Sequence, residues 1–137
     1  MLHPLPLAIA LVIAATVWLF MRRGRIDLLR LRELLDQGAQ LIDVRTVGEF
    51  DRGHIPGARN LPVVELSKAT GLPTDLQQPL VVYCQSGARS ALAARLLRRQ
   101  GRPHVYDFGP IDRWPGSIER THVHAPAAID QDTDPVG

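Results

Sequence analysis

The feature that most constrains the fold is a run in which an apolar strand pattern passes directly into a helical pattern. Residues 80–83, Leu-Val-Val-Tyr, are apolar and rich in β-branched side chains, as expected for a strand buried on both faces. Beyond them, apolar side chains recur at helical spacing, at Ala91, Leu92, Ala94, Leu96 and Leu97. A strand followed so closely by a helix is typical of a parallel α/β sheet.

The only cysteine of the chain, Cys84, lies at this junction. Backbone N–H groups at a helix start have no partner within the helix, and the helix dipole is positive there, so the thiolate form of a cysteine is favoured. Arg89 adds a fixed positive charge, and Gly87 permits a tight turn. A lone buried cysteine is usually only a small apolar residue. This combination makes Cys84 a candidate nucleophile.

The segments before and after this unit continue the alternation. Asp27 is a candidate N-cap for a leucine-rich helix that stops near Gly38. Strands are predicted at residues 41–45 and 105–108, and a brief helix at residues 62–67. A polar segment at 46–52 precedes a turn that contains glycine and proline. The pattern therefore predicts a small parallel sheet with helices on both faces.

The amino-terminal residues 5–21 carry no charge and are followed by Arg22, Arg23 and Arg25. As a helix this run would be about 26 Å long, a little short of the roughly 30 Å hydrocarbon core, with snorkelling arginines to extend it. The positive-inside rule then keeps the remaining chain in the cytoplasm. We therefore expect a single-pass anchor at residues 5–21, in a bacterial inner membrane, with the folded domain on the cytoplasmic face.

Two other interpretations of this segment are a cleaved signal peptide and a buried apolar helix. A signal peptide would carry basic residues before its apolar core and a small-residue cleavage site after it, and neither is present. The single cysteine also fits a reducing compartment, because it has no partner for an internal disulfide.

Length and charge limit the remaining possibilities. The 137 residues divide into an anchor with its basic flank (1–25), one folded domain (26–120) and a polar, disordered tail (121–137). Sixteen basic against 14 acidic residues give a net charge of +2, too small to indicate nucleic-acid binding. His122 and His124 lie in the tail without nearby ligands, so no metal site is expected.

The spacing from Cys84 to Arg89 limits what the loop can hold. Four residues separate them, one fewer than in the Cys-x5-Arg loop with which cysteine phosphatases surround phosphate. Successive N–H groups in such a turn form an anion-binding nest whose width depends on the number of residues. A narrower nest suits a terminal sulfur atom carried on Cys84 as a persulfide better than it suits phosphate. A cysteine phosphatase or arsenate reductase is therefore a less favoured alternative.

Four blocks occur in a distinctive order: Leu41-Ile42-Asp43-Val44-Arg45, then Glu49-Phe50 with Gly53-His54-Ile55-Pro56-Gly57-Ala58, then Asn60-Leu61-Pro62, then Cys84-x-x-Gly87-x-Arg89-Ser90. Through these blocks, residues 27–114 resemble a single-domain rhodanese, a family of sulfurtransferases. The resemblance implies a rhodanese-like fold with a parallel five-stranded α/β sheet. It also implies that the loop cysteine accepts sulfane sulfur from a donor and passes it to a nucleophilic acceptor.

The resemblance also suggests roles for individual residues. Cys84 would be the catalytic, persulfide-forming nucleophile, and the substrate-binding loop would consist of Gln85, Ser86, Gly87, Ala88 and Arg89. Asp43, Arg45 and Ser90 would support that loop. Arg89 has a second interpretation as the ion-pair partner of Asp43 or Glu49.

Two departures from the family pattern stand out. Gly109-Pro110 replaces the paired glycines that many relatives carry before the late tryptophan, here Trp114, so the last helix is expected to be shortened. Thiosulfate-specialised relatives often carry basic residues after the cysteine, whereas Gln85 and Ser86 are neutral. The sequence therefore leaves the sulfur donor open.

The expected activity is sulfur transfer through a Cys84 persulfide, from a small-molecule sulfane donor such as thiosulfate to a thiol or cyanide. No second cysteine is present to resolve the persulfide, so the acceptor is a separate molecule, including a possible protein acceptor. Neither a metal nor an organic cofactor is expected. The main alternative is a non-catalytic adaptor or persulfide carrier for a membrane partner. A cysteine protease is disfavoured because nothing places His104 or His122 beside Cys84.

Overall fold

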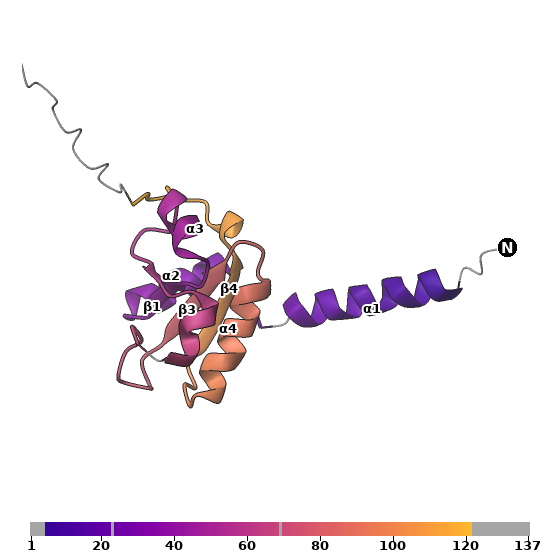
Figure 1. The fold of residues 1–137 in the computed structure, drawn as a ribbon, viewed down its shortest axis with the longest axis horizontal. Helices are drawn as coiled ribbons and strands as arrows, with labels where there is room; N and C mark the ends of the chain where they lie inside the picture. Colours follow the sequence, from indigo (N-terminus) through magenta and orange to yellow (C-terminus); the bar gives the residue numbers. More distant parts are fainter. Residues whose placement is uncertain (1–4, 23, 69, 122–137) are drawn as a thin grey trace, which may run out of the picture.

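The computed structural model describes residues 5–22, 24–68 and 70–121 of the chain. Helix α1 projects away from a domain in which a sheet lies between helices (Figure 1). The elements, in chain order, are α1 (Leu5–Arg22), α2 (Leu28–Asp36), β1 (Gln40–Asp43), α3 (Val47–Arg52), β2 (Arg59–Asn60), the 3-10 helix η1 (Val63–Lys68), β3 (Leu80–Cys84), α4 (Ala88–Arg99), β4 (Val105–Pro110) and the 3-10 helix η2 (Ile111–Arg113).

The sheet is parallel, with the strand order β2-β1-β3-β4. The parallel α/β fold is thus confirmed, but the described residues form four strands rather than the expected five. At the outer edge of β4, strand pairing continues for one residue pair only, a parallel bridge between Arg25 and Asp107. Asp27 caps α2 two residues later, so the chain leaves the sheet edge before a fifth strand can form.

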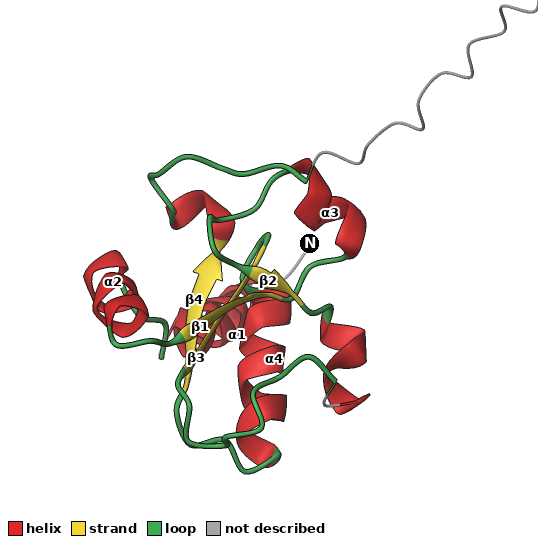
Figure 2. Ribbon diagram, turned by 90° about the vertical axis from the view of Figure 1, so that its left-hand side faces the viewer, coloured by secondary structure: helices red, strands yellow, loops and turns green. Residues whose placement is uncertain are grey.

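The sheet is covered on both faces, as predicted, with α2 on one side and α4 on the other (Figure 2). Side chains of β3 alternate between these faces. Leu80, Val82 and Cys84 pack in the cluster that includes Leu97 of α4, whereas Val81 and Tyr83 pack in the cluster that includes Leu31 of α2. All five residues of β3 are fully buried, which explains its nearly continuous apolar sequence.

Local signals account for several boundaries. The Asp27 carboxylate accepts a hydrogen bond from the Arg30 amide at 2.8 Å, which confirms the predicted N-cap. The polar segment 46–52, for which no element was predicted, forms α3, because Thr46 and Glu49 make a reciprocal capping box. The brief helix predicted at residues 62–67 is the 3-10 helix η1, and the expected shortening after β4 appears as the single turn η2.

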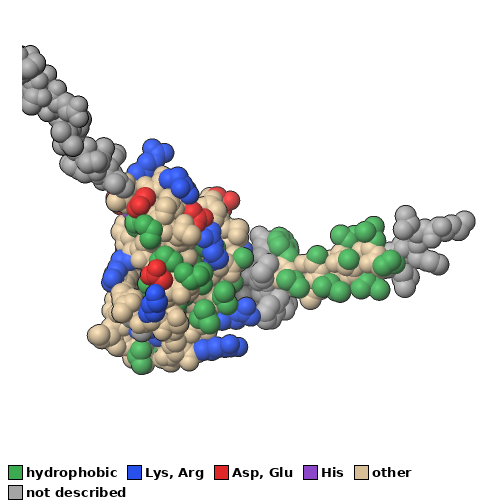
Figure 3. Space-filling model, viewed as in Figure 1, with side chains coloured by type: hydrophobic (Ala, Val, Ile, Leu, Met, Phe, Trp, Pro, Cys, Tyr) green, Lys and Arg blue, Asp and Glu red, His purple; other side chains and the backbone are tan. Residues whose placement is uncertain are grey.

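Helix α1 occupies the segment that the sequence predicts to be a membrane anchor. Apolar side chains are exposed along its length (Figure 3), including Leu7 and Ile13. Among helices built from the described residues, none combines the length and apolar character needed to cross a bilayer. At 1.5 Å per residue, 18 residues span about 27 Å, against roughly 30 Å of hydrocarbon. The transmembrane prediction for residues 5–21 is therefore not supported.

Candidate active site

Cys84 is the last residue of β3, and the start of α4 faces its sulfur. The Cys84 Sγ accepts hydrogen bonds from the Gly87 amide at 3.0 Å and the Ser90 amide at 3.3 Å. The predicted convergence of backbone amides is therefore present. Ser90, predicted only to support the loop, contacts the sulfur directly through its backbone N–H. Such donors stabilise negative charge on the sulfur.

Gly87 makes the tight turn from strand to helix possible. Its φ of +93° lies in the left-handed region, which residues other than glycine rarely adopt. A Cβ at this position would lie 3.2 Å from Pro110 Cδ and would also collide with the guanidinium of Arg25. The Ser90 hydroxyl donates to the Gly87 carbonyl at 3.2 Å and closes the turn.

The remaining loop residues surround this turn. Gln85, Ser86 and Ala88 are exposed, whereas Cys84 itself has no exposed surface. Cys84 also packs in the apolar cluster between the sheet and α4. The sulfur thus lies beneath a rim of small and neutral side chains, with its polar contacts directed at the loop.

Asp43 and Arg45 form a buried ion pair beside the loop. The Arg45 Nη2 lies 2.6 Å from the Asp43 carboxylate, and the side chains are 5% and 0% exposed. Arg45 also donates to the Gln85 side chain at 3.1 Å and to the Gly53 carbonyl at 2.7 Å. Burial lowers the pKa of Arg45, but the hydrogen bond and charge of Asp43 outweigh it and raise the pKa overall. The pair therefore acts on the loop through Gln85.

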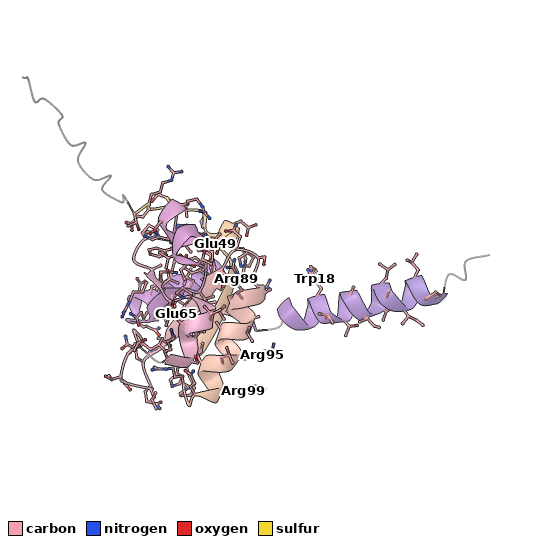
Figure 4. The ribbon with its side chains drawn as sticks, in the orientation of Figure 1. Trp18, Glu49, Glu65, Arg89, Arg95 and Arg99 are labelled. Carbon is pink, nitrogen blue, oxygen red and sulfur yellow. The ribbon has the colours of Figure 1, made fainter. Side chains whose placement is uncertain are left out.

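Arg89 pairs with Glu49 rather than with Asp43. Its two terminal nitrogens donate to the two Glu49 carboxylate oxygens at 2.7 and 2.8 Å, and Figure 4 shows the two side chains close together. The Arg89 hydrogen bond lowers the pKa of Glu49 to about 2. The interpretation of Arg89 as an ion-pair partner of Glu49 thus has direct geometric support. Its contact with a substrate stays a prediction.

A cavity of about 280 Å³ lies next to the loop, lined by Arg45, Glu49, Arg52, Gly53 and Gln85. Arg52 was missed as a site residue, because α3 itself was not predicted. A larger hollow of about 710 Å³ is lined by residues such as Leu35 and Gln40 and includes no residue of the cysteine loop. Of these two, only the smaller cavity borders the cysteine loop, through Gln85.

The chain was compared with known proteins. Residues 27–114 match the family model of the rhodanese-like domain. The chain is 38% identical over 79 residues to the thiosulfate sulfurtransferase GlpE of Shewanella oneidensis, covering 57% of this chain and 77% of GlpE. The human single-domain sulfurtransferase TSTD1 is a solved structure with a TM-score of 0.60 and 34% identity, covering 66% of this chain and 94% of TSTD1.

YqhL of Bacillus subtilis, an uncharacterized protein, is 43% identical over 83 residues. The alignment covers 59% of this chain, and the chain spans 64% of the length of YqhL. The family match includes every predicted site residue, from Asp43 and Arg45 to the loop that begins at Cys84. With the parallel sheet and the cysteine at the end of its central strand, these findings show that the chain belongs to the rhodanese-like domain family, which includes sulfurtransferases.

Proposed function

We propose that this protein is a sulfurtransferase that carries sulfane sulfur on Cys84 as a persulfide. The observation that carries the proposal is the pair of backbone hydrogen bonds from Gly87 and Ser90 to the Cys84 sulfur. These donors are in place before any substrate binds, so they can stabilise an anionic sulfur without further reorganisation. The thiosulfate sulfurtransferase name of GlpE supports the same chemistry.

The reaction has two half-reactions. In the first, the Cys84 thiolate attacks the outer sulfur of thiosulfate; a new S–S bond forms, the bond to the inner sulfur breaks, and sulfite leaves with the electron pair. In the second, cyanide or a thiolate attacks the outer sulfur of the persulfide. Thiocyanate or a new persulfide leaves, and the Cys84 thiolate is restored. Charge and atoms balance in both steps.

Access to the sulfur requires a local motion. Because Cys84 has no exposed surface, a donor reaches it only when the loop opens or the cysteine side chain rotates. Gln85 lines the 280 Å³ cavity, and both Gln85 and Ser86 are exposed to solvent on this side of the loop. We propose that donor and acceptor approach from this side.

The acceptor is a separate molecule. Cys84 is the only cysteine in the sequence, so no second thiol of this chain can take the sulfur. A small thiol, cyanide or a cysteine of another protein would serve. A protein acceptor would have to insert a flexible segment, because the sulfur lies below the loop surface.

The test is a mass measurement on the intact chain after incubation with thiosulfate. We expect wild type to gain one sulfur atom and to lose it on addition of cyanide with release of thiocyanate, and Cys84→Ser to do neither. Ser86→Ala is a matched control that alters the loop but leaves the nucleophile in place. Absence of the added sulfur with thiosulfate and with a polysulfide would refute the proposal. Turnover of an aryl phosphate that depends on Cys84 would favour a phosphatase instead.

A second proposal concerns location. We propose that α1 attaches the domain to the cytoplasmic face of a membrane, because its exposed apolar side chains would be removed from water there and the arginines that follow would be attracted to the anionic lipids of that leaflet. Fractionation of cells that express the tagged chain tests it. The proposal predicts recovery with membranes, and loss from them when Leu11 and Ile13 are both changed to Glu. Recovery of the intact wild type in the soluble fraction would contradict it.

A further inference from the structure

Arg25 lies outside the segment matched by the family model, yet it reaches the cysteine loop. A Cβ built on Gly87 would lie 2.8 Å from the Arg25 Cζ, and one built on Gly109 would lie 3.0 Å from its Cδ and Nε. The absence of a side chain at both glycines therefore lets the arginine lie against the Gly87 turn and the end of β4. Its side chain is 16% exposed, so it is largely enclosed there.

The edge of the sheet fixes Arg25 in this place. Arg25 forms the parallel bridge to Asp107, and the next amide, Ile26, donates to the Asp107 carbonyl at 2.9 Å. The Asp107 carboxylate lies 3.8 Å from the Arg25 Nε and also accepts from the Gly109 amide at 2.8 Å. The Arg25 Nε is buried without a hydrogen-bond partner, so the ion pair with Asp107 is its polar contact.

The contact matters because Gly87 supplies one of the two amides that hold the Cys84 sulfur. A guanidinium packed on Gly87 restricts the motion of this turn and places a positive charge behind it. The loop itself carries neutral side chains at Gln85 and Ser86, and Arg89 is neutralised by Glu49. Arg25 also faces a carboxylate, that of Asp107, but at 3.8 Å and without a hydrogen bond from its Nε, so it is paired less tightly than Arg89 is with Glu49. Arg25 therefore adds a second guanidinium beside the loop, besides that of Arg89, whose charge also acts on Cys84.

We propose that Arg25 is a positioning residue for the Cys84 loop, which holds the Gly87 turn in place and favours negative charge on the sulfur. Its effect on sulfur transfer rests on the proposed function. Its effect on the reactivity of the thiol does not, and the two can be measured separately.

The experiment uses the full-length chain and follows alkylation of Cys84 by iodoacetamide from about pH 6 to pH 10. Arg25→Met removes the charge but keeps a long apolar side chain, whereas Arg25→Lys keeps the charge. Arg32→Gln, at an exposed position of α2, is the control for a general change in net charge. We expect the ratio of the alkylation rate at pH 7 to the rate at pH 10 to fall by about threefold or more in Arg25→Met, to stay close to wild type in Arg25→Lys, and to be unchanged in Arg32→Gln.

An unchanged rate ratio in Arg25→Met, or an equal fall in Arg25→Met and Arg25→Lys, would overturn the proposal. Circular dichroism checks that each variant is folded, and Arg25→Gln replaces Arg25→Met if the latter is not. Persulfide formation is then measured on the same samples. If wild type forms no persulfide but the rate ratio falls in Arg25→Met as expected, the proposed function fails and the role of Arg25 stands. If wild type forms the persulfide but the rate ratio does not change, the role of Arg25 fails and the proposed function stands.

Discussion

Two ion pairs flank the cysteine loop, and they differ in burial rather than in contact distance. Asp43 and Arg45 approach to 2.6 Å, and Glu49 and Arg89 to 2.7 Å. The first pair is almost fully buried, whereas the side chains of the second are 23% and 34% exposed. Asp43 and Arg45 are separated by one residue at the end of β1, whereas Glu49 and Arg89 join α3 to α4.

This difference assigns the pairs different roles. Breaking a buried pair leaves an uncompensated charge without water, so the contact persists and can fix the position of Gln85 and Gly53. Water can replace either partner of a partly exposed pair at small cost. The Glu49–Arg89 pair can therefore open at small cost, while the Asp43–Arg45 pair stays in place.

The largest expected effect comes from removing the buried carboxylate. Asp43→Asn leaves Arg45 buried beside a neutral amide, so we expect the free energy of unfolding to fall by about 3 kcal/mol. Urea denaturation measures this loss. Glu33→Gln in the exposed Arg30–Glu33 pair of α2 is the matched control and should cost less than about 0.5 kcal/mol. Equal losses in the two variants would contradict the distinction by burial.

A smaller effect is expected when the charge of the buried pair is kept but its shape is changed. Arg45→Lys retains a cation near Asp43 and loses the simultaneous hydrogen bonds to Gln85 and Gly53, so we expect a loss of about 1–2 kcal/mol. Because Gln85 is no longer held, proteolysis at the loop should become faster. Thermal unfolding and limited proteolysis check the two parts. Unchanged proteolysis would mean that Arg45 does not restrain the loop.

Breaking the partly exposed pair should cost less stability and change catalysis instead. Glu49→Gln is expected to lower the free energy of unfolding by no more than about 1 kcal/mol, because both side chains contact solvent. The freed Arg89 charge should raise kcat/KM for thiosulfate roughly two- to fivefold, and added salt should reduce the gain. Glu65→Gln on η1 is the control at an exposed acidic residue. A fall in kcat/KM would show that Arg89 needs Glu49 to be productive.

The smallest effect is a dependence of stability on pH. The pKa of Glu49 is lowered from 4.5 to about 2 in the folded chain, so the folded state binds fewer protons there than the unfolded state. The stabilisation from the pair is fully present above pH 4.5 and is lost as the pH falls toward 2. We expect wild type to lose up to about 1 kcal/mol more than Glu49→Gln over this interval, after allowance for solvent screening. Melting temperatures of the two chains at pH 5 and pH 2.5 compare them. If the melting temperatures of the two chains fall by the same amount, the Glu49–Arg89 pair does not make stability depend on pH.

Several elements could be predicted because their signals are local. The strand before Cys84, the N-cap at Asp27 and the glycine turn after the cysteine each depend on a few consecutive residues. Helix α3 is harder to predict, because segment 46–52 is short and polar and its main helical signal is the capping box of Thr46 and Glu49. The expected fifth strand was wrong because a single bridge at Arg25 takes its place.

Amino-acid order alone is enough to predict the parallel α/β fold, the position of the cysteine between strand and helix, and the glycine that allows its turn. These features follow from apolar periodicity and backbone sterics, which act over neighbouring residues. Three contacts become visible only in the folded chain: Arg89 with Glu49, Arg45 with Gln85, and Arg25 with Gly87. Which charge meets which partner depends on how distant segments pack, because the attraction between charges is strong only where the fold brings them together and excludes water.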